Sequence, residues 1–241
     1  MTGHKIVSEK EWTDARRKLL DREKELTDLQ EEIAKERRAL PWVKVTKNYV
    51  FDTPDGKKSL ADLFAGNSQL IVYHFMFGPD WKEGCVGCSF LSDHVDGANQ
   101  HLKHHDVTYV AVSRAPLEKL TAYRKRMGWK FPWVSSEGSD FNYDFHVSFT
   151  KDQVAKGEAT YNFEPYTGEM EDLHGTSVFF KDADGAIYHT YSAYARGDER
   201  SLGTYMWLDI SPKGRNEGEG GNLTNWVKRH DQYDDAPKAA E

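Results

Sequence analysis

The chain has 241 residues, with 32 Lys and Arg against 39 Asp and Glu, so its net charge is -7. This length supports one sizeable folded domain, or one domain with an appendage. The acidic balance, without a clustered basic stripe, argues against nucleic-acid binding. No apolar run reaches the roughly 18–20 residues of a membrane span, and the charged start of the chain lacks the pattern of a signal peptide. We therefore expect a cytoplasmic protein that binds neither nucleic acid nor membrane.

Residues 8–40 are predicted to form one long helix. Ser8 and Glu11 fit a capping box at its start. An apolar residue recurs every seven positions along it, at Trp12, Leu19, Leu26, Ile33 and Leu40. Charged Arg22 and Glu36 interrupt the companion row of this apolar seam. Two interpretations stay open: the helix packs against its own chain, or it pairs with the helix of a second copy to give a homodimer.

From residue 41 to about residue 210, apolar strands alternate with amphipathic helices. The run Leu70–Phe77 has the composition of a strand that is buried on both faces, and Asp55-Gly56 predicts a hairpin turn. The other expected strands are 43–51, 107–112, 131–134, 178–181 and 186–191, and the expected helices are 59–64, 90–104, 117–127 and 199–208. This order is typical of a thioredoxin-like α/β sandwich with a central mixed sheet.

We therefore divide the chain into a helical arm at 1–40, a thioredoxin-like domain at 41–210 and a C-terminal tail at 211–241. The tail is rich in Gly, Asn and charged residues, and Trp226 is its one evident anchor. A segment of this composition is expected to be loosely ordered.

The two cysteines of the chain, Cys85 and Cys88, form a single Cys-x-x-Cys motif between a predicted strand and a predicted helix. A helix start stabilises a thiolate through its unpaired backbone N–H groups. We therefore expect Cys85 to act as the nucleophile. Cys88, one turn further into the helix, would then resolve a mixed disulfide. The pattern predicts a redox-active disulfide in a thiol–disulfide oxidoreductase.

Three alternatives stay open. A zinc site would need two further ligands, and the histidines that could supply them show no full ligand spacing, so we expect no metal and no other cofactor; these are His74, His94, His101, His104 and His105. A thiol peroxidase of the peroxiredoxin type usually has a Thr three residues before its reactive Cys, where this chain has Lys82. The third alternative is a non-catalytic partner-binding module, with the helical seam as its interface and the thiols as a redox sensor.

Four further residues are candidates for supporting roles. Trp81 could shield the thiols or fill a gap in the core. Asp80 and Glu83 could relay protons, although carboxylates just before a helix are commonly caps. Arg114 follows a predicted strand near a helix start, where it could meet an anion or be an ordinary surface arginine.

The chain also resembles a thioredoxin-like family catalogued as domain of unknown function 899, from about Val7 to Arg215. The strings that carry the resemblance are Glu11-Trp-Thr-Asp-Ala-Arg16, Arg38-Ala-Leu-Pro-Trp-Val43, Tyr73-His-Phe-Met-Phe-Gly-Pro-Asp-Trp81, Val112-Ser-Arg-Ala-Pro-Leu117, Gly128-Trp-Lys-Phe-Pro-Trp-Val-Ser-Ser136 and Asp140-Phe-Asn-Tyr-Asp-Phe145. The resemblance implies a thioredoxin-like fold and a dithiol–disulfide role, with an unknown thiol or disulfide as substrate.

Two departures from ordinary thioredoxins limit what the resemblance implies. Trp81 lies four residues before Cys85, and Val86-Gly87 fills the centre of the motif, so the direction of electron flow stays open. Gly175-Thr-Ser177 stands where thioredoxins place a cis-proline before a strand. Thr176 is therefore a further candidate supporting residue, and the backbone that would pair with a substrate peptide is expected to differ, which favours a small or dedicated substrate over general protein disulfides.

Overall fold

The computed structural model describes residues 3–215, 217 and 225–234, and the chain divides into two compact units, Met1–Pro41 and Trp42–Glu241. The first unit contains helix α1 (Glu9–Ala39). Its capping box is confirmed: the Ser8 hydroxyl accepts from the Glu11 N–H, and the Glu11 carboxylate accepts from the Ser8 N–H at 2.9 Å. No residue of α1 is buried.

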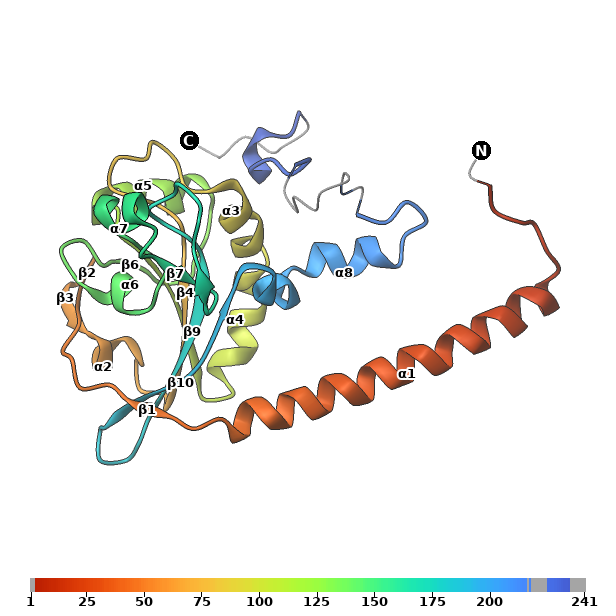
Figure 1. Cartoon of the computed structure of the whole chain (residues 1–241), viewed down its shortest axis with the longest axis horizontal. Coiled ribbons are helices and arrows are strands. Elements are labelled where there is room, and N and C mark those ends of the chain that lie inside the picture. Colours follow the sequence, from red (N-terminus) through yellow and green to blue (C-terminus); the bar gives the residue numbers. More distant parts are fainter. Residues whose placement is uncertain (1–2, 216, 218–224, 235–241) are drawn as a thin grey trace. The chain divides into compact units, whose positions relative to one another are not determined.

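The second unit is built on one eight-stranded mixed sheet, in the order β1-β10-β9-β4-β5-β6-β2-β3 (Figure 1). Strands β4, β5 and β6 are parallel to one another, and the other pairings are antiparallel. The bounds are β1 (Val43–Lys44), β2 (Val50–Thr53), β3 (Gly56–Ser59), β4 (Gln69–His74), β5 (Val107–Ser113), β6 (Trp133–Ser135), β9 (Gly175–Lys181) and β10 (Ile187–Tyr194). The predicted thioredoxin-like sandwich with a central mixed sheet is confirmed.

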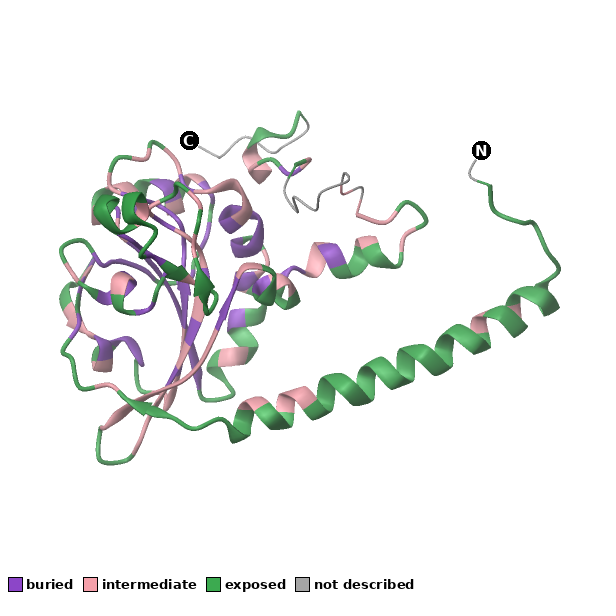
Figure 2. Cartoon of the chain, viewed as in Figure 1, coloured by how far each residue is buried: buried purple, intermediate pink, exposed green. Residues whose placement is uncertain are grey.

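Helices cover both faces of this sheet, because successive strand residues point to opposite sides. Tyr73 packs in the core on one face and Val72 in the core on the other. The Tyr73 face carries α3 (Val86–Ser92), α4 (Val95–Lys103), α5 (Leu117–Arg126) and α8 (Gly203–Asp209), and the Val72 face carries α2 (Leu60–Leu63) and α6 (Phe141–Asp144). Figure 2 shows the buried central strands between these layers.

Smaller elements complete the second unit. Helix α7 (Lys151–Lys156) precedes a two-stranded ribbon of β7 (Thr160–Tyr161) and β8 (Glu164–Pro165), and 3-10 turns η1 (Ala195–Ser201) and η2 (His230–Gln232) follow later in the chain. No helix in the described part of the chain is both long enough and apolar enough to cross a membrane.

Three predicted elements are divided in the structure. The expected strand 43–51 is β1 at one edge of the sheet and β2 near the other, and Lys47 fixes the crossing between them through ion pairs with Asp140 and Asp144. The expected helix 90–104 is α3 and α4, which break at Asp93, and the expected helix 199–208 is η1 and α8. The Asp93 carboxylate is held by the Trp129 indole at 2.8 Å and the His230 ring at 2.6 Å. It therefore points away from the helix axis.

The described part of the expected tail, residues 225–234, makes specific contacts. Val227 is buried in the core, and the Trp226 ring meets the Phe90 ring of α3 with centroids 6.0 Å apart. Asp231 pairs with Arg126 of α5 at 2.6 Å. These contacts correct the expectation of a loose tail for this stretch, while residues 216, 218–224 and 235–241 lie outside the described residues.

Candidate functional site

Both cysteines lie where the chain leaves the central strand β4. The Cys85 N–H donates to the Met76 carbonyl at 3.1 Å, and the Met76 N–H donates to the Cys88 sulfur at 3.4 Å. These two bonds fold the loop back on the end of the strand, so that Cys85 is the N-cap residue of α3. Both thiols are free; Cys85 is half-buried and Cys88 is buried.

An aromatic floor supports this loop. The rings of Phe75, Phe77, Tyr123 and Trp133 contact one another beneath it. Gly84 lies so close to the floor that an added Cβ would fall 2.6 Å from the Phe75 ring. A residue without a side chain is therefore required immediately before Cys85.

The two thiols have opposite acidities. The pKa of Cys85 is lowered to about 6, chiefly by a hydrogen bond from the Cys88 thiol, and further by the N–H groups of Cys88 and Gly87 and the charge of Arg229. Burial raises the pKa of Cys88 well above its usual range, and the neighbouring Cys85 adds to the effect. Hydrogen bonds from the Tyr73 hydroxyl and the Met76 N–H offset this in part. At neutral pH the negative charge therefore resides on Cys85.

Arg229 reaches this loop from the C-terminal segment. Its guanidinium donates to the Gly84 carbonyl at 2.6 Å and to the Tyr123 hydroxyl at 2.8 Å, and it pairs with Glu83 at 3.1 Å. The Arg229 side chain is only 13% exposed. A cation in a partly buried position is screened less than one at the surface, so it stabilises the thiolate next to Gly84 more effectively.

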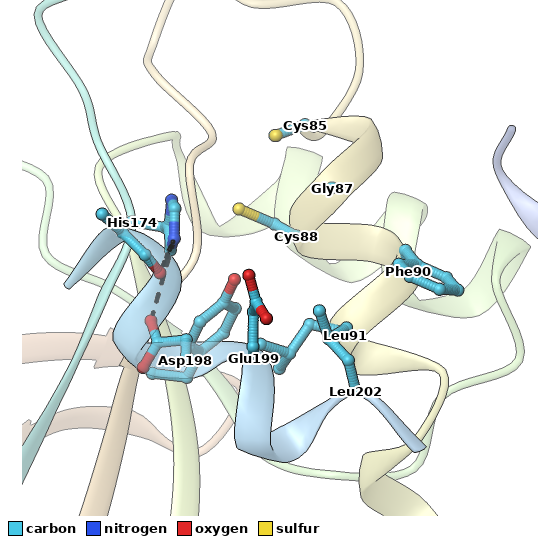
Figure 3. A pocket seen from close by; sticks show the side chains of 11 residues that line it. Cys85, Gly87, Cys88, Phe90, Leu91, His174, Asp198, Glu199 and Leu202 are labelled. Carbon is cyan, nitrogen blue, oxygen red and sulfur yellow. Dashed lines mark hydrogen bonds and ion pairs between the residues drawn. The ribbon is translucent and has the colours of Figure 1, made fainter. Parts of the chain in front are cut away.

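The cysteines open into a cavity of about 160 Å³. Figure 3 shows the Cys88 sulfur pointing into the space between α3 and the ribbon that carries Asp198 and Glu199. The lining residues are Tyr73, Cys85, Gly87, Cys88, Phe90, Leu91, His174, Ala195, Asp198, Glu199 and Leu202. The motif therefore faces a partly open cavity whose lining includes the acidic side chains of Asp198 and Glu199 (Figure 3).

Asp198 is the notable titratable group across this cavity. Burial raises the pKa of its carboxyl to about 7, against the opposing effect of a hydrogen bond with Thr176. Its Oδ2 is buried and has no hydrogen-bond partner among the described residues, and His174 Nε2 lies 3.9 Å away. The pKa of His174 is lowered by burial, so this histidine is neutral near pH 7. Asp198 can therefore take up or release a proton near neutral pH.

The predicted supporting residues fall into different places. Thr176 does not line the cavity itself but makes a hydrogen bond with Asp198, which does. Trp81 is half-buried and packs against the core, and Asp80 is exposed. Glu83 lies behind the loop, where it binds Arg229 and Arg126 and where the Arg126 hydrogen bond lowers its pKa.

Arg114 is neither a surface arginine nor open to an anion. Its side chain is 13% exposed, and its guanidinium makes two 2.7 Å bonds to the Asp172 carboxylate and one 2.6 Å bond to the Tyr143 hydroxyl. The Ser148 hydroxyl also donates to Asp172. This closed network fixes the loop after β5.

Sequence reasoning missed four residues of the site: Tyr73, His174, Asp198 and Arg229. The composition of the strand predicts only that Tyr73 is buried, although its hydroxyl is a signal for a polar partner in the core. The other three lie 86 or more positions after Cys88 in the chain. No local spacing connects them to the motif.

A metal site has little support in this geometry. Among residues 3–215, 217 and 225–234, no group of three or more His, Cys, Asp or Glu side chains is arranged to hold a metal ion. His101 and His105, at helical spacing in the sequence, belong to the exposed end of α4 and the turn after it.

The family model described as "Bacterial protein of unknown function (DUF899)" matches residues 1–233. No curated protein matches the chain. Among solved structures, the peroxidoxin BcpB of Mycobacterium tuberculosis aligns with a TM-score of 0.45 and 13% identity, over 68% of this chain and 94% of that one. A PrxQ mutant of Xylella fastidiosa gives 0.44 and 16%, over 69% and 94%. A putative protein disulfide isomerase of Bacteroides thetaiotaomicron gives 0.39 and 16%, over 69% and 91%.

Proposed function

The chain belongs to the DUF899 family of bacterial proteins, and from the geometry of its cysteine pair we propose that it is a thiol–disulfide oxidoreductase that acts through Cys85 and Cys88. The observation that carries the proposal is the opposite acidity of two thiols that share one cavity. We further propose a cytoplasmic location, where reducing conditions keep such a pair available as thiols.

The first step is attack by the Cys85 thiolate on one sulfur of a substrate disulfide. The substrate S–S bond breaks, a substrate thiolate leaves, and a mixed disulfide joins Cys85 to the remaining half. A pKa of about 6 keeps most of Cys85 ionised at pH 7, while its nucleophilicity stays close to the optimum for exchange.

The second step is attack by Cys88 on the Cys85 sulfur. Cys88 must first lose its proton, and Asp198 across the cavity accepts it, because a carboxyl with a pKa of about 7 is about half ionised at neutral pH. The second substrate thiolate then leaves, and a Cys85–Cys88 disulfide remains. The substrate has gained two electrons and the protein has lost two; the same steps in reverse would oxidise a dithiol.

The cavity favours a small disulfide. Its volume is about 160 Å³, and His174 and Asp198 are among its lining residues. Glu199 also lines it but is paired with Arg196 and Arg215, so the ionised form of Asp198 is the carboxylate that disfavours an anionic group buried beside it. We therefore infer a preference for neutral or cationic disulfides over strongly acidic ones.

Trapping tests the first step. Cys88→Ser cannot resolve a mixed disulfide, so incubation with cystamine or cystine should leave a stable adduct on Cys85, detected by mass spectrometry. Cys85→Ser is the matched control and should give none under the same conditions. Turnover with hydrogen peroxide but not with any disulfide would indicate a thiol peroxidase. Neither turnover nor adduct would indicate a non-catalytic, redox-sensing module.

Asp198→Asn tests the second step. It keeps the shape of the side chain but removes the proton acceptor, so closure of the Cys85–Cys88 disulfide at pH 7 should slow by about tenfold or more. Adduct formation on Cys85 should keep its rate. In the unaltered protein the closure rate should rise with pH through about 7, as Asp198 ionises. Closure at the same rate and with the same pH profile in both proteins would remove Asp198 from the mechanism.

A further inference from the structure

Helix α1 carries an apolar row that nothing in the first unit covers. The helix is 31 residues long and has no buried residue. Trp12, Leu19 and Leu26 of the row are 60%, 55% and 55% exposed, and Leu29 is 50% exposed. Most helices in proteins depend on the packing of one apolar face for their stability, so this row requires an occupant.

The spacing of the row defines a heptad. With Trp12, Leu19, Leu26, Ile33 and Leu40 at the a positions, Ala15 and Leu29 occupy d positions. A seven-residue apolar repeat that continues over four heptads is typical of helices that pair side by side in a coiled coil. It specifies another helix as the occupant, but not yet which helix.

The charges beside the row identify that helix and its direction. In a parallel two-stranded coiled coil, each g position faces the e position five residues further along the other strand. A second copy of α1, placed parallel and in register, gives three g–e pairs of opposite charge and one charged–neutral pair on each side of the seam: Glu11–Arg16, Lys18–Glu23, Glu32–Arg37 and Glu25–Gln30. The attractive pairs outnumber the two like-charged contacts at d positions, where Arg22 faces Arg22 and Glu36 faces Glu36.

The antiparallel alignment is less favourable. There, g faces g and e faces e. When residues 9–39 overlap in full, Glu25 and Glu23 each face the same residue of the second copy, which is repulsive, and Lys18–Glu32 is attractive. Charges that flank a coiled-coil seam set orientation and partner choice, so they disfavour this orientation.

We propose that α1 pairs with α1 of a second copy of this chain in a parallel, in-register two-stranded coiled coil. The proposal uses the apolar row and its flanking charges only, and it stands or falls independently of the thiol chemistry.

The two charged d positions set the register. Arg22 is paired with Glu25 of its own helix at 2.8 Å, and its side chain is 78% exposed. Polar residues at core positions fix register and strand number at a cost in stability. With Arg22 and Glu36 in the seam, the dimer is expected to dissociate reversibly rather than to be permanent.

Charge reversal on the full chain tests the pairing, with sedimentation equilibrium as the measurement. Glu32→Lys replaces two attractive pairs per dimer with two repulsive ones, so the dissociation constant should rise about tenfold. Glu32→Lys combined with Arg37→Glu should restore it. Side chains five residues apart are not neighbours on one helix, so this rescue cannot arise within a single chain. Glu31→Lys, the same change one residue away and outside the seam, is the matched control.

A cysteine at Ala15 tests the orientation. In a Cys85→Ser, Cys88→Ser chain, Ala15→Cys should form a disulfide-linked dimer on mild oxidation, because equivalent d positions meet only in the parallel, in-register arrangement. Thr13→Cys, on the outer face, should not. A strictly monomeric chain at micromolar concentration would overturn the proposal, and so would an equal effect of Glu31→Lys and Glu32→Lys. Failure of Ala15→Cys to crosslink in a dimer would overturn the parallel orientation.

Discussion

Identical side chains take different roles here because their surroundings differ. Cys85 receives hydrogen bonds from the first turn of α3 and faces Arg229, whereas Cys88 lies one turn deeper in the core. Burial disfavours any charged form, so it acts on both thiols, but only Cys85 has enough donors to overcome it. The same rule raises the pKa of the Asp198 carboxyl, for which a single hydrogen bond with Thr176 does not offset burial.

His74 shows the same rule on the other face of the sheet. Its ring is fully buried and packs against Phe141 and Phe145, with Nε2 2.9 Å from the Ser177 hydroxyl. Burial, together with a smaller effect of the neighbouring His189, lowers its pKa from 6.5 to about 3. The folded protein therefore holds His74 neutral in a range of pH where the unfolded chain protonates it.

This difference predicts acid sensitivity. As pH falls below about 6.5, His74 is protonated in the unfolded state but stays neutral in the folded state. The free energy of unfolding therefore decreases until pH approaches 3. Between pH 7 and 5 the His74 contribution amounts to about 2 kcal/mol. Glutamine does not titrate in this range. The free energy of unfolding of His74→Gln, measured in urea, should therefore decrease by about 2 kcal/mol less than that of the unaltered protein between pH 7 and 5. Equal losses in both proteins would show that His74 does not cause the sensitivity.

At the scale of elements, the loop before α3 depends on close backbone approach. We predict that Gly84→Ala destabilises the protein by about 1–3 kcal/mol, because the new Cβ would lie 2.6 Å from Phe75 and 3.0 Å from Tyr123, both held in the core. Gly97→Ala in α4 is the matched control. It meets no atom within 4 Å and should stabilise the helix by about 0.5–1 kcal/mol.

Thermal unfolding of the two variants measures both effects. Gly84→Ala should also slow alkylation of Cys85 at pH 6, because a shifted loop moves the thiol away from its donors. If the two alanine variants changed stability in the same direction, the loop would have more freedom than its contacts indicate.

What the sequence could predict follows from the range of the interactions. The strand β4 and the capping box of α1 depend on neighbouring residues, and both were predictable from composition and spacing. The expected helix is divided into α3 and α4 at Asp93, whose side-chain partners Trp129 and His230 are far along the chain. The local hydrophobic periodicity of a helix cannot predict side-chain contacts with residues so distant in the sequence.

The site shows the same limit. The Cys-x-x-Cys spacing predicts Cys85 and Cys88 as site residues, and the position of Cys85 at the start of α3 explains why it ionises more readily. Asp198 reaches the cavity only because β9 and β10 bring η1 next to the end of β4. A single aspartate in a charged stretch of sequence gives no sign of burial, and this is why Asp198 could not be predicted as a residue of the cavity.

At the scale of the whole molecule, the C-terminal segment completes the site that begins at residue 85. Val227 is buried in the core, Trp226 meets Phe90, and Arg229 binds the Gly84 carbonyl. A chain that ends at Thr224 loses all three contacts, whereas a chain that ends at Asp234 keeps them. The two truncations therefore separate this segment from the residues that follow it.

The shorter chain should differ from the longer one in two ways. Its free energy of unfolding should be lower by about 3 kcal/mol, as expected for the exposure of one large and one medium apolar side chain. Alkylation of Cys85 by iodoacetamide at pH 6 should slow about two- to threefold, because loss of the Arg229 charge raises the pKa of the thiol. Coincident unfolding curves and alkylation rates would show that the segment lies on the domain without supporting it. A loss of stability alone would assign it to the core, and a change in both would make it a working part of the thiol site.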